Sequence, residues 1–255
     1  MSSNNNQSKL VVITGASSGI GATTAVEFAA KGYKLLLLAR RLDRLEQLVK
    51  DSSNSLSFEN TVIHQCDIIQ VDQIKEGIEK AKKQFNISSV DCLINNAGVM
   101  LLQPLLTQPL SDQNQMFDTN VKGLLNASHA VLKEMVENKQ GTIINISSIA
   151  GTKSFPSAAA YCGTKHAVHA ISETLRSEVA GSKVRVVIVS PGFTESELLG
   201  HNEKENSEGF EAMVNSWEMG ALKSKDIADA ILYAYEAPKH VCVREIKLAP
   251  TEQTV

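Results

Sequence analysis

A tyrosine and a lysine four positions apart, Tyr161 and Lys165, are the side chains most suited to chemistry. In a helix, residues at this spacing share one face, so we expect the phenol and the ammonium to lie together. A free tyrosine has a pKa of about 10 and is a poor base, but a nearby positive charge favours the phenolate. Such a tyrosine can accept a proton from an alcohol or donate one to a developing alkoxide. Ser148 ends the preceding predicted strand, where its hydroxyl can hold the substrate oxygen.

A glycine-rich run near the start of the chain has the composition of a phosphate-binding turn. It follows an apolar stretch, precedes a predicted helix and has the spacing G-x-x-x-G-x-G. Glycines permit a tight turn, while a helix N-terminus offers free N–H groups and a positive dipole end to pyrophosphate. The alternative is a glycine turn without a ligand, which the strand–turn–helix context disfavours. The residues of this predicted dinucleotide cradle are Gly15, Ser17, Ser18, Gly19, Ile20 and Gly21.

The residues after the second predicted strand favour NADP over NAD. Proteins selective for NAD usually have Asp or Glu here, where the carboxylate accepts a hydrogen bond from the ribose 2′-hydroxyl. This strand instead ends at Ala39, which is followed at once by Arg40 and Arg41. Guanidinium groups pair well with a 2′-phosphate, although two solvated arginines are the plainer alternative. We therefore predict NADP(H) as the cofactor.

Apolar and amphipathic stretches alternate in a pattern typical of a parallel α/β sheet. We expect strands at residues 10–14, 33–39, 61–65, 90–94, 141–146, 183–189 and 240–248. Helices are expected at residues 20–31, 44–51, 70–85, 111–137 and 157–179. Another helix is expected to be capped by Ser224 and to carry Asp226 in its first turn. The pattern predicts an α/β fold, a doubly wound, Rossmann-like parallel sheet of about seven strands with helices on both faces.

One domain, residues 10–255, is predicted, because no internal repeat and no linker rich in proline and glycine divides the chain. Residues 1–9 are polar and rich in Asn and Ser, and we expect them to be disordered. Residues 194–220 depart from the alternation of strands and helices, and we expect them to form an insert that covers the substrate site.

The composition, with 43% apolar and 21% charged residues, is that of an ordinary globular protein. A net charge of −3 argues against a nucleic-acid-binding protein, which usually carries a basic patch. The N-terminus lacks the apolar core of a signal peptide and no apolar run is long enough for a membrane span, so we expect a cytoplasmic protein. The four cysteines form no C-x-x-C pair, and His166 and His169 have no evident third partner, so no metal site is predicted.

Together these motifs resemble those of the short-chain dehydrogenase/reductase family, in its short single-domain branch, over roughly residues 10–250. The resemblance depends on the combination, since Y-x-x-x-K alone is common on amphipathic helices. The glycine spacing also differs from that of the longer sugar-nucleotide epimerase branch. The motifs are Thr14-Gly15-x-x-x-Gly19-x-Gly21, Asn95-Asn96-Ala97-Gly98, Asn120, Ser148, Tyr161-x-x-x-Lys165 and Pro191-Gly192.

The resemblance implies four catalytic residues. Tyr161 would be the acid/base, and Ser148 would orient and polarise the substrate carbonyl. Lys165 would lower the pKa of Tyr161 and hydrogen-bond the nicotinamide ribose. Asn120, in the long helix, would hold a water molecule in a proton relay that runs through Lys165.

The resemblance also implies contacts with the adenosine half of the cofactor. Asp67 would contact the adenine, with Ile68 beside the ring. The adenine–ribose side would be lined by Asn95, Ala97 and Gly98, with Asn95 serving in part to stabilise the sheet.

At the nicotinamide end, the resemblance implies that Pro191, Gly192 and the next few residues cover the ring. Ser196 stands where the family usually has threonine, so a hydroxyl is kept although its contact with the amide is less well defined. Hydride would leave the B face of the nicotinamide, as in the family.

These expectations combine in an NADP(H)-dependent oxidoreductase that transfers hydride between nicotinamide and a small alcohol or carbonyl substrate, favouring ketone or aldehyde reduction. Residues 244–253 are similar to the C-terminal strand of carbonyl reductases and 3-hydroxy-acid dehydrogenases of the family. Family members are commonly tetramers built through the long helix, the catalytic helix and the last strand, so we expect a homotetramer or homodimer. The alternatives are an NAD-dependent alcohol or 3-hydroxy-acid dehydrogenase and a non-catalytic NADP sensor, although such sensors typically lose the tyrosine or the lysine.

Overall fold

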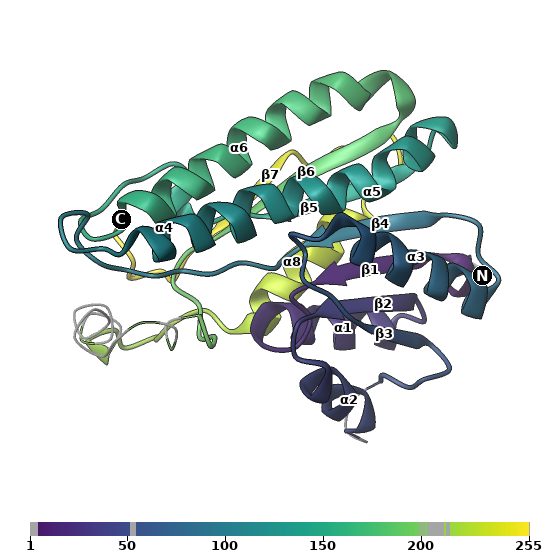
Figure 1. Cartoon of the computed structure of the whole chain (residues 1–255), viewed down its shortest axis with the longest axis horizontal. Helices are drawn as coiled ribbons and strands as arrows, with labels where there is room; N and C mark the ends of the chain where they lie inside the picture. The colour runs from purple at the N-terminus through teal and green to yellow at the C-terminus, as the bar shows by residue number, and fades with distance from the viewer. Residues whose placement is uncertain are drawn as a thin grey trace.

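The computed structural model of the chain describes residues 5–51, 55–198, 200, 202, 212 and 215–254. Seven parallel strands form one sheet in the order β3-β2-β1-β4-β5-β6-β7 (Figure 1). The strands are β1 (Leu10–Thr14), β2 (Lys34–Ala39), β3 (Thr61–Gln65), β4 (Val90–Asn95), β5 (Gly141–Ile146), β6 (Val184–Pro191) and β7 (Glu245–Leu248). The strand order reverses direction at β1 and β4, so the predicted doubly wound, Rossmann-like fold is confirmed.

Helices cover both faces of the sheet because its strands are apolar on both sides. The helices are α1 (Gly19–Ala30), α2 (Leu42–Lys50), α3 (Val71–Phe85), α4 (Leu110–Phe117), α5 (Leu124–Glu137), α6 (Ala159–Val179) and α8 (Ser224–Glu236). In β1, Val11 and Ile13 belong to the core shared with α1, α2 and α8. The alternate residues Leu10 and Val12 belong to the core shared with α3, α5 and α6 on the opposite face. Because all the strand pairs are parallel, the carboxyl ends of the strands lie along one edge of the sheet, where ligands bind in such folds.

The predicted long helix at residues 111–137 is divided into three segments. Between α4 and α5, residues Asp118–Gly123 form a π-helical turn, η2, that carries Asn120. The side chain of Asn120 is bonded to the backbone of Val99, in the loop after β4. The segment is a wider turn than the sequence periodicity predicts, and such π-turns are frequent at functional sites.

Most other boundaries lie within two residues of the prediction, but the start of the last strand and the cap of helix α8 need correction. The last strand begins at Glu245 rather than at residue 240. Helix α8 is capped by Lys223 rather than by Ser224, because the Asp226 carboxylate accepts the Lys223 N–H at 2.7 Å. The Ser224 hydroxyl instead donates to the backbone oxygen of Glu195, and therefore ties α8 to the segment after β6.

The two irregular regions expected from the sequence lie partly outside the described residues. Of residues 1–9, Asn5–Ser8 form a short 3-10 helix, η1, and Asn6 donates a hydrogen bond to the Lys31 carbonyl. Of the 194–220 insert, Thr194 forms a bridge with Leu222, and Phe193 and Trp217 make an edge-to-face contact. None of the helices in the described part of the chain is long and apolar enough to cross a membrane.

Candidate active site

The three side chains predicted to carry chemistry meet at the carboxyl end of β5. Ser148 follows β5 and caps the short 3-10 helix η3 (Ile149–Gly151), with its hydroxyl accepting the Ala150 N–H at 3.1 Å. Tyr161 and Lys165 are buried on α6. The Lys165 ammonium donates to the Ile146 carbonyl at 3.0 Å and lies 5.8 Å from the centre of the Tyr161 ring. All three line one cavity of about 410 Å³.

Burial determines the protonation of this group. It raises the pKa of Tyr161 to about 12, even though the Ser148 hydroxyl acts in the opposite direction. It also lowers the pKa of Lys165 to about 8, so this cation is itself less favourable than an exposed lysine. Lys165 is not among the groups that shift the pKa of Tyr161 here, so the expectation that it lowers this pKa stays a prediction. Tyr161 is a protonated phenol at neutral pH and is suited to act as an acid.

Asn120 is buried behind the cavity and fixes the loop after β4. Its Oδ1 accepts the Val99 N–H at 2.8 Å, and its Nδ2 donates to the Val99 carbonyl at 2.9 Å and to Thr164 Oγ1 at 3.1 Å. Its Oδ1 and the Lys165 ammonium both lie within 4 Å of the position that a Cβ on Gly98 would take. Asn120 is therefore close to Lys165, but its side chain is already engaged, and its role in a water relay remains a prediction.

The glycine-rich turn is held by close backbone contacts that larger residues would break. Gly15 and Gly19 have positive φ angles of 65° and 52°, which suit glycine. A Cβ on Gly15 would lie 2.7 Å from Ala97 Cα. A Cβ on Gly21 would lie 2.5 Å from Asn96 Nδ2, so Gly21 permits packing beneath the turn and is not in the cavity wall. Helix α1 begins at the cavity, because its first residues, Gly19 and Ile20, line the cavity wall.

Asn96 lines the cavity, although the sequence reasoning did not select it as a site residue. Its Nδ2 donates to the carbonyls of Thr14 and Gly15, both at 3.1 Å, and so links β4 to the glycine-rich turn. Thr14 Oγ1 in turn accepts the N–H groups of Asn96 and Ala97. The run of two asparagines after an apolar strand is the signal in the sequence, but it does not tell which of the two faces the cavity.

Asn95 faces the interior instead, which corrects the prediction that it lines the adenine–ribose side of the cofactor. It is only 4% exposed and does not line the cavity. Its Nδ2 donates to Ser128 Oγ and to Asn145 Oδ1, and the Asn145 amide donates to Ser172 Oγ. Neighbouring residues of a strand point to opposite sides, which separates Asn95 from Asn96. The buried network supports only the sheet-stabilising part of the expectation.

Two serines and one arginine converge beside the turn. Arg41 Nη2 donates to Ser17 Oγ at 3.2 Å and to Ser18 Oγ at 2.9 Å. Arg40 is exposed at the edge of the same cavity, and its backbone carbonyl accepts a bond from Gln65. A guanidinium with two adjacent hydroxyls is a donor set that fits a phosphate monoester. The residues here therefore fit the 2′-phosphate of NADP.

The other predicted cofactor contacts lie in the cavity wall. Those that share this position are Ile20, Asp67, Ile68, Ala97, Gly98, Pro191, Gly192 and Ser196. Gln253, close to the end of the chain, also lines the cavity and was not predicted. Its Oε1 accepts the Phe193 N–H at 2.9 Å, so the C-terminal segment supports the residues that follow β6. No local pattern indicates a contact between residues so far apart in sequence.

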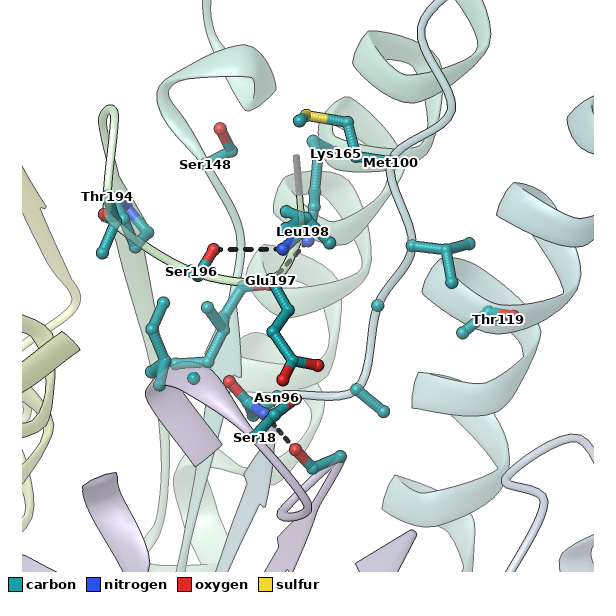
Figure 2. Close-up of a pocket in the computed structure, with 18 of the residues that line it drawn as sticks. Ser18, Asn96, Met100, Thr119, Ser148, Lys165, Thr194, Ser196, Glu197 and Leu198 are labelled. Carbon is teal, nitrogen blue, oxygen red and sulfur yellow. Dashed lines mark hydrogen bonds between the residues drawn. The ribbon is translucent and has the colours of Figure 1, made fainter. Parts of the chain in front are cut away.

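Apolar side chains surround the Ser148 end of the cavity. They are Val99, Met100, Leu102, Ile149, Phe155, Phe193 and Leu198. Figure 2 shows Met100 beside Lys165, across the cavity from Ser148. The cationic side chains among the described wall residues are Lys165, Arg40 and Arg41, and the two arginines belong to the opposite end. In the part of the chain that is described, no cluster of His, Cys, Asp or Glu side chains has the arrangement of a metal site.

This sheet, with a glycine-rich turn after β1 and a Ser–Tyr–Lys group beside β5, defines an oxidoreductase domain of the Rossmann type. Residues 9–207 match the short chain dehydrogenase family. Over 255 residues, covering 99% of this chain and 100% of the other, the chain is 40% identical to an uncharacterized oxidoreductase of Staphylococcus saprophyticus. The chain therefore belongs to the short-chain dehydrogenase/reductase family and is an oxidoreductase.

Solved structures similar to this chain include complexes with NADP. The closed form of a serine dehydrogenase complexed with NADP+ is 31% identical, with a TM-score of 0.85 and coverage of 96% of each chain. ElxO with NADP bound is 30% identical, with a TM-score of 0.79 and coverage of 94% of this chain and 97% of that one. The likeness extends over nearly the whole domain, including the segment beyond residue 207.

Proposed function

We propose that the chain is an NADPH-dependent reductase of ketones or aldehydes. The observation that carries this proposal is that the buried Tyr161 lines the same cavity as the Arg41–Ser17–Ser18 donor set. Reduction of a carbonyl needs an acid at the oxygen, and a phenol with a pKa of about 12 is in the acid form at neutral pH. The NADP-bound structures of similar chains support the choice of cofactor.

Each of these cavity residues would have a distinct role in the reaction. NADPH, when bound, would supply the hydride. Ser148 would donate a hydrogen bond to the carbonyl oxygen, and Tyr161 would transfer its proton to that oxygen as negative charge develops there. Lys165 would stabilise the phenolate that remains until a proton returns from solvent. Arg41 and the two serines would hold the 2′-phosphate, and the N-terminus of α1 would face the pyrophosphate.

The apolar wall around Ser148 supports an uncharged substrate. A carboxylate placed there would lose its hydration without gaining a cationic partner among the described wall residues other than Lys165. Lys165 is already bonded to the Ile146 carbonyl and lies against Tyr161. A second candidate, dehydrogenation of a hydroxy acid, is favoured by the likeness to serine dehydrogenase. The apolar wall argues against it.

A substrate panel tests this choice. We expect NADPH oxidation with apolar ketones, diketones and aldehydes, and at least about tenfold lower kcat/KM with 3-keto acids of similar size, since an unpaired buried charge is costly. The same panel with NADH and, in the other direction, with serine and 3-hydroxy acids separates the alternatives. Faster turnover of the acids than of the neutral compounds would favour the dehydrogenase. Tight NADPH binding with no turnover of any compound would favour a sensor.

The pH dependence of turnover gives a second test. Ketone reduction uses Tyr161 in its protonated form and Lys165 in its charged form, so we expect a flat rate below the lysine pKa of about 8. Above that value the rate should fall, approaching about tenfold per pH unit, as Lys165 loses its charge. Alcohol oxidation needs Tyr161 to lose a proton and should rise with pH near neutrality. Measuring kcat in both directions checks the sign, and a reduction rate that rises with pH would contradict the proposal.

An oligomer remains part of the proposal. Leu110, Phe117 and Leu125, along α4 and α5, are exposed by 73%, 46% and 45%. Large apolar side chains exposed together commonly mark an interface. They support the expectation that two or four copies of the chain associate through these helices.

A further inference from the structure

The segment after β6 lies across the glycine-rich turn and brings an acidic side chain into the cofactor cavity. A Cβ placed on Gly19 would lie 3.4 Å from the Ser196 Cβ, so the two segments are in contact. The next residue, Glu197, lines the cavity, and Figure 2 shows its carboxylate pointing toward Ser18 and Asn96.

This carboxylate is bound by the arginine that is expected to bind phosphate. Glu197 Oε2 is 3.1 Å from Arg41 Nη1, and both carboxylate oxygens lie within 2.7 Å of Arg44 Nη1. Arg41 uses its other terminal nitrogen for Ser17 and Ser18. Burial raises the pKa of Glu197, but the hydrogen bonds from Arg44 and Arg41 lower it overall, so the side chain is charged at neutral pH. An anion therefore already occupies one side of the predicted phosphate site.

We propose that Glu197 competes with the 2′-phosphate of NADP(H) for Arg41 and thereby limits the preference of the chain for NADP(H) over NAD(H). A phosphate dianion and a carboxylate on one guanidinium repel each other, so binding of the phosphate requires Glu197 to move away or to bind Arg44 alone. NAD(H) lacks this phosphate and leaves the pair between Glu197 and Arg41 intact. The chain thus has a carboxylate near this arginine, although its second strand ends in Ala39.

The inference rests on the proposed function only in that a dinucleotide binds in this cavity with its 2′ position near Arg41. It does not depend on which substrate is reduced, or on whether the chain catalyses turnover. Binding measurements on the full chain therefore test it separately from any activity assay.

The test compares Glu197→Gln with the matched control Glu195→Gln. Glu195 lies two residues earlier in the same segment, pairs with Lys223 and does not line the cavity, so its substitution removes the same charge without touching Arg41. Affinities are measured by titration calorimetry for NADPH, NADH, adenosine 2′,5′-bisphosphate and adenosine 5′-monophosphate. The last two probes differ in the 2′-phosphate and do not reach the nicotinamide end.

We expect Glu197→Gln to tighten the binding of NADPH and adenosine 2′,5′-bisphosphate by roughly three- to tenfold. The substitution removes both the half-exposed ion pair with Arg41 and the repulsion between the carboxylate and the 2′-phosphate. NADH and adenosine 5′-monophosphate should bind as before, and Glu195→Gln should match the unsubstituted chain. Unchanged or weaker binding of the 2′-phosphorylated probes to Glu197→Gln would overturn the inference, as would equal tightening of all four. If the unsubstituted chain prefers NADH but Glu197→Gln still gains NADPH affinity selectively, the inference stands and the proposed NADPH preference fails.

Discussion

Replacing Tyr161 with phenylalanine is expected to lower kcat for NADPH-dependent ketone reduction by about 10²- to 10⁴-fold, the usual contribution of a positioned general acid. The change removes one hydroxyl from a buried ring and leaves the packing of α6 intact, because Tyr161 is only 5% exposed and the ring is retained. NADPH affinity should change little, since the Arg41–Ser17–Ser18 set and the glycine-rich turn are untouched. Steady-state kinetics and a fluorescence titration with NADPH measure the two quantities separately.

Tyr233→Phe is the matched control for this prediction. Tyr233 lies on α8, is 68% exposed and does not line the cavity, so loss of its hydroxyl should leave kcat unchanged. Turnover of Tyr161→Phe at the level of the control would refute the acid role of Tyr161. Loss of NADPH binding together with turnover would show instead that the hydroxyl serves the cofactor.

Replacing Arg41 with alanine is expected to weaken NADPH binding by about 10- to 30-fold and NADH binding by less than about threefold. Hydrogen bonds to charged groups contribute about 1.5–3 kcal/mol, and partial exposure of the Arg41 side chain places this site at the lower end. The loss of affinity should be larger for NADPH because NADPH carries the 2′-phosphate that the guanidinium binds, and NADH does not. Dissociation constants for both cofactors at one ionic strength measure the effect.

Arg40→Ala is the control that separates the two neighbouring arginines. Arg40 carries the same charge at the same strand end, but Arg41 is the one bonded to Ser17 and Ser18. We therefore expect a clearly smaller loss of NADPH affinity for Arg40→Ala. Equal losses of affinity for NADPH and NADH in Arg41→Ala would show that Arg41 does not bind the 2′-phosphate selectively. Equal losses in the two variants would show that general charge, rather than the bonded geometry, determines selectivity.

Much of the fold follows from local patterns in the sequence. The apolar runs that become β1 to β6 are visible as short blocks, because strands buried on both faces need no polar alternation. Tyr161 and Lys165 are brought together by helical spacing alone, and Ser148 comes shortly after the buried strand that ends at Ile146. Residues 111–137 were predicted as one continuous helix. The contact of Asn120 with Val99, which accompanies the π-turn, cannot be recognised from the local sequence.

The parts of the site that sequence patterns did not predict depend on contacts between distant residues. Glu197 meets Arg41 across 156 positions, and Gln253 meets Phe193 across 60 positions. The choice between Asn95 and Asn96 depends on which side of β4 faces the turn. No periodicity or motif contains this information, because it is created when separate elements pack.

The sequence by itself determined the type of sheet, the glycine turn and the candidates for the proton-transferring side chains, since each is a matter of residue type and short spacing. The tertiary structure decided their electrostatics. Burial raises the pKa of Tyr161 to about 12 and lowers that of Lys165 to about 8, because the charged form of each group loses its hydration inside the protein. Packing of the segment after β6 onto the first turn likewise placed a carboxylate on the arginine expected to bind phosphate.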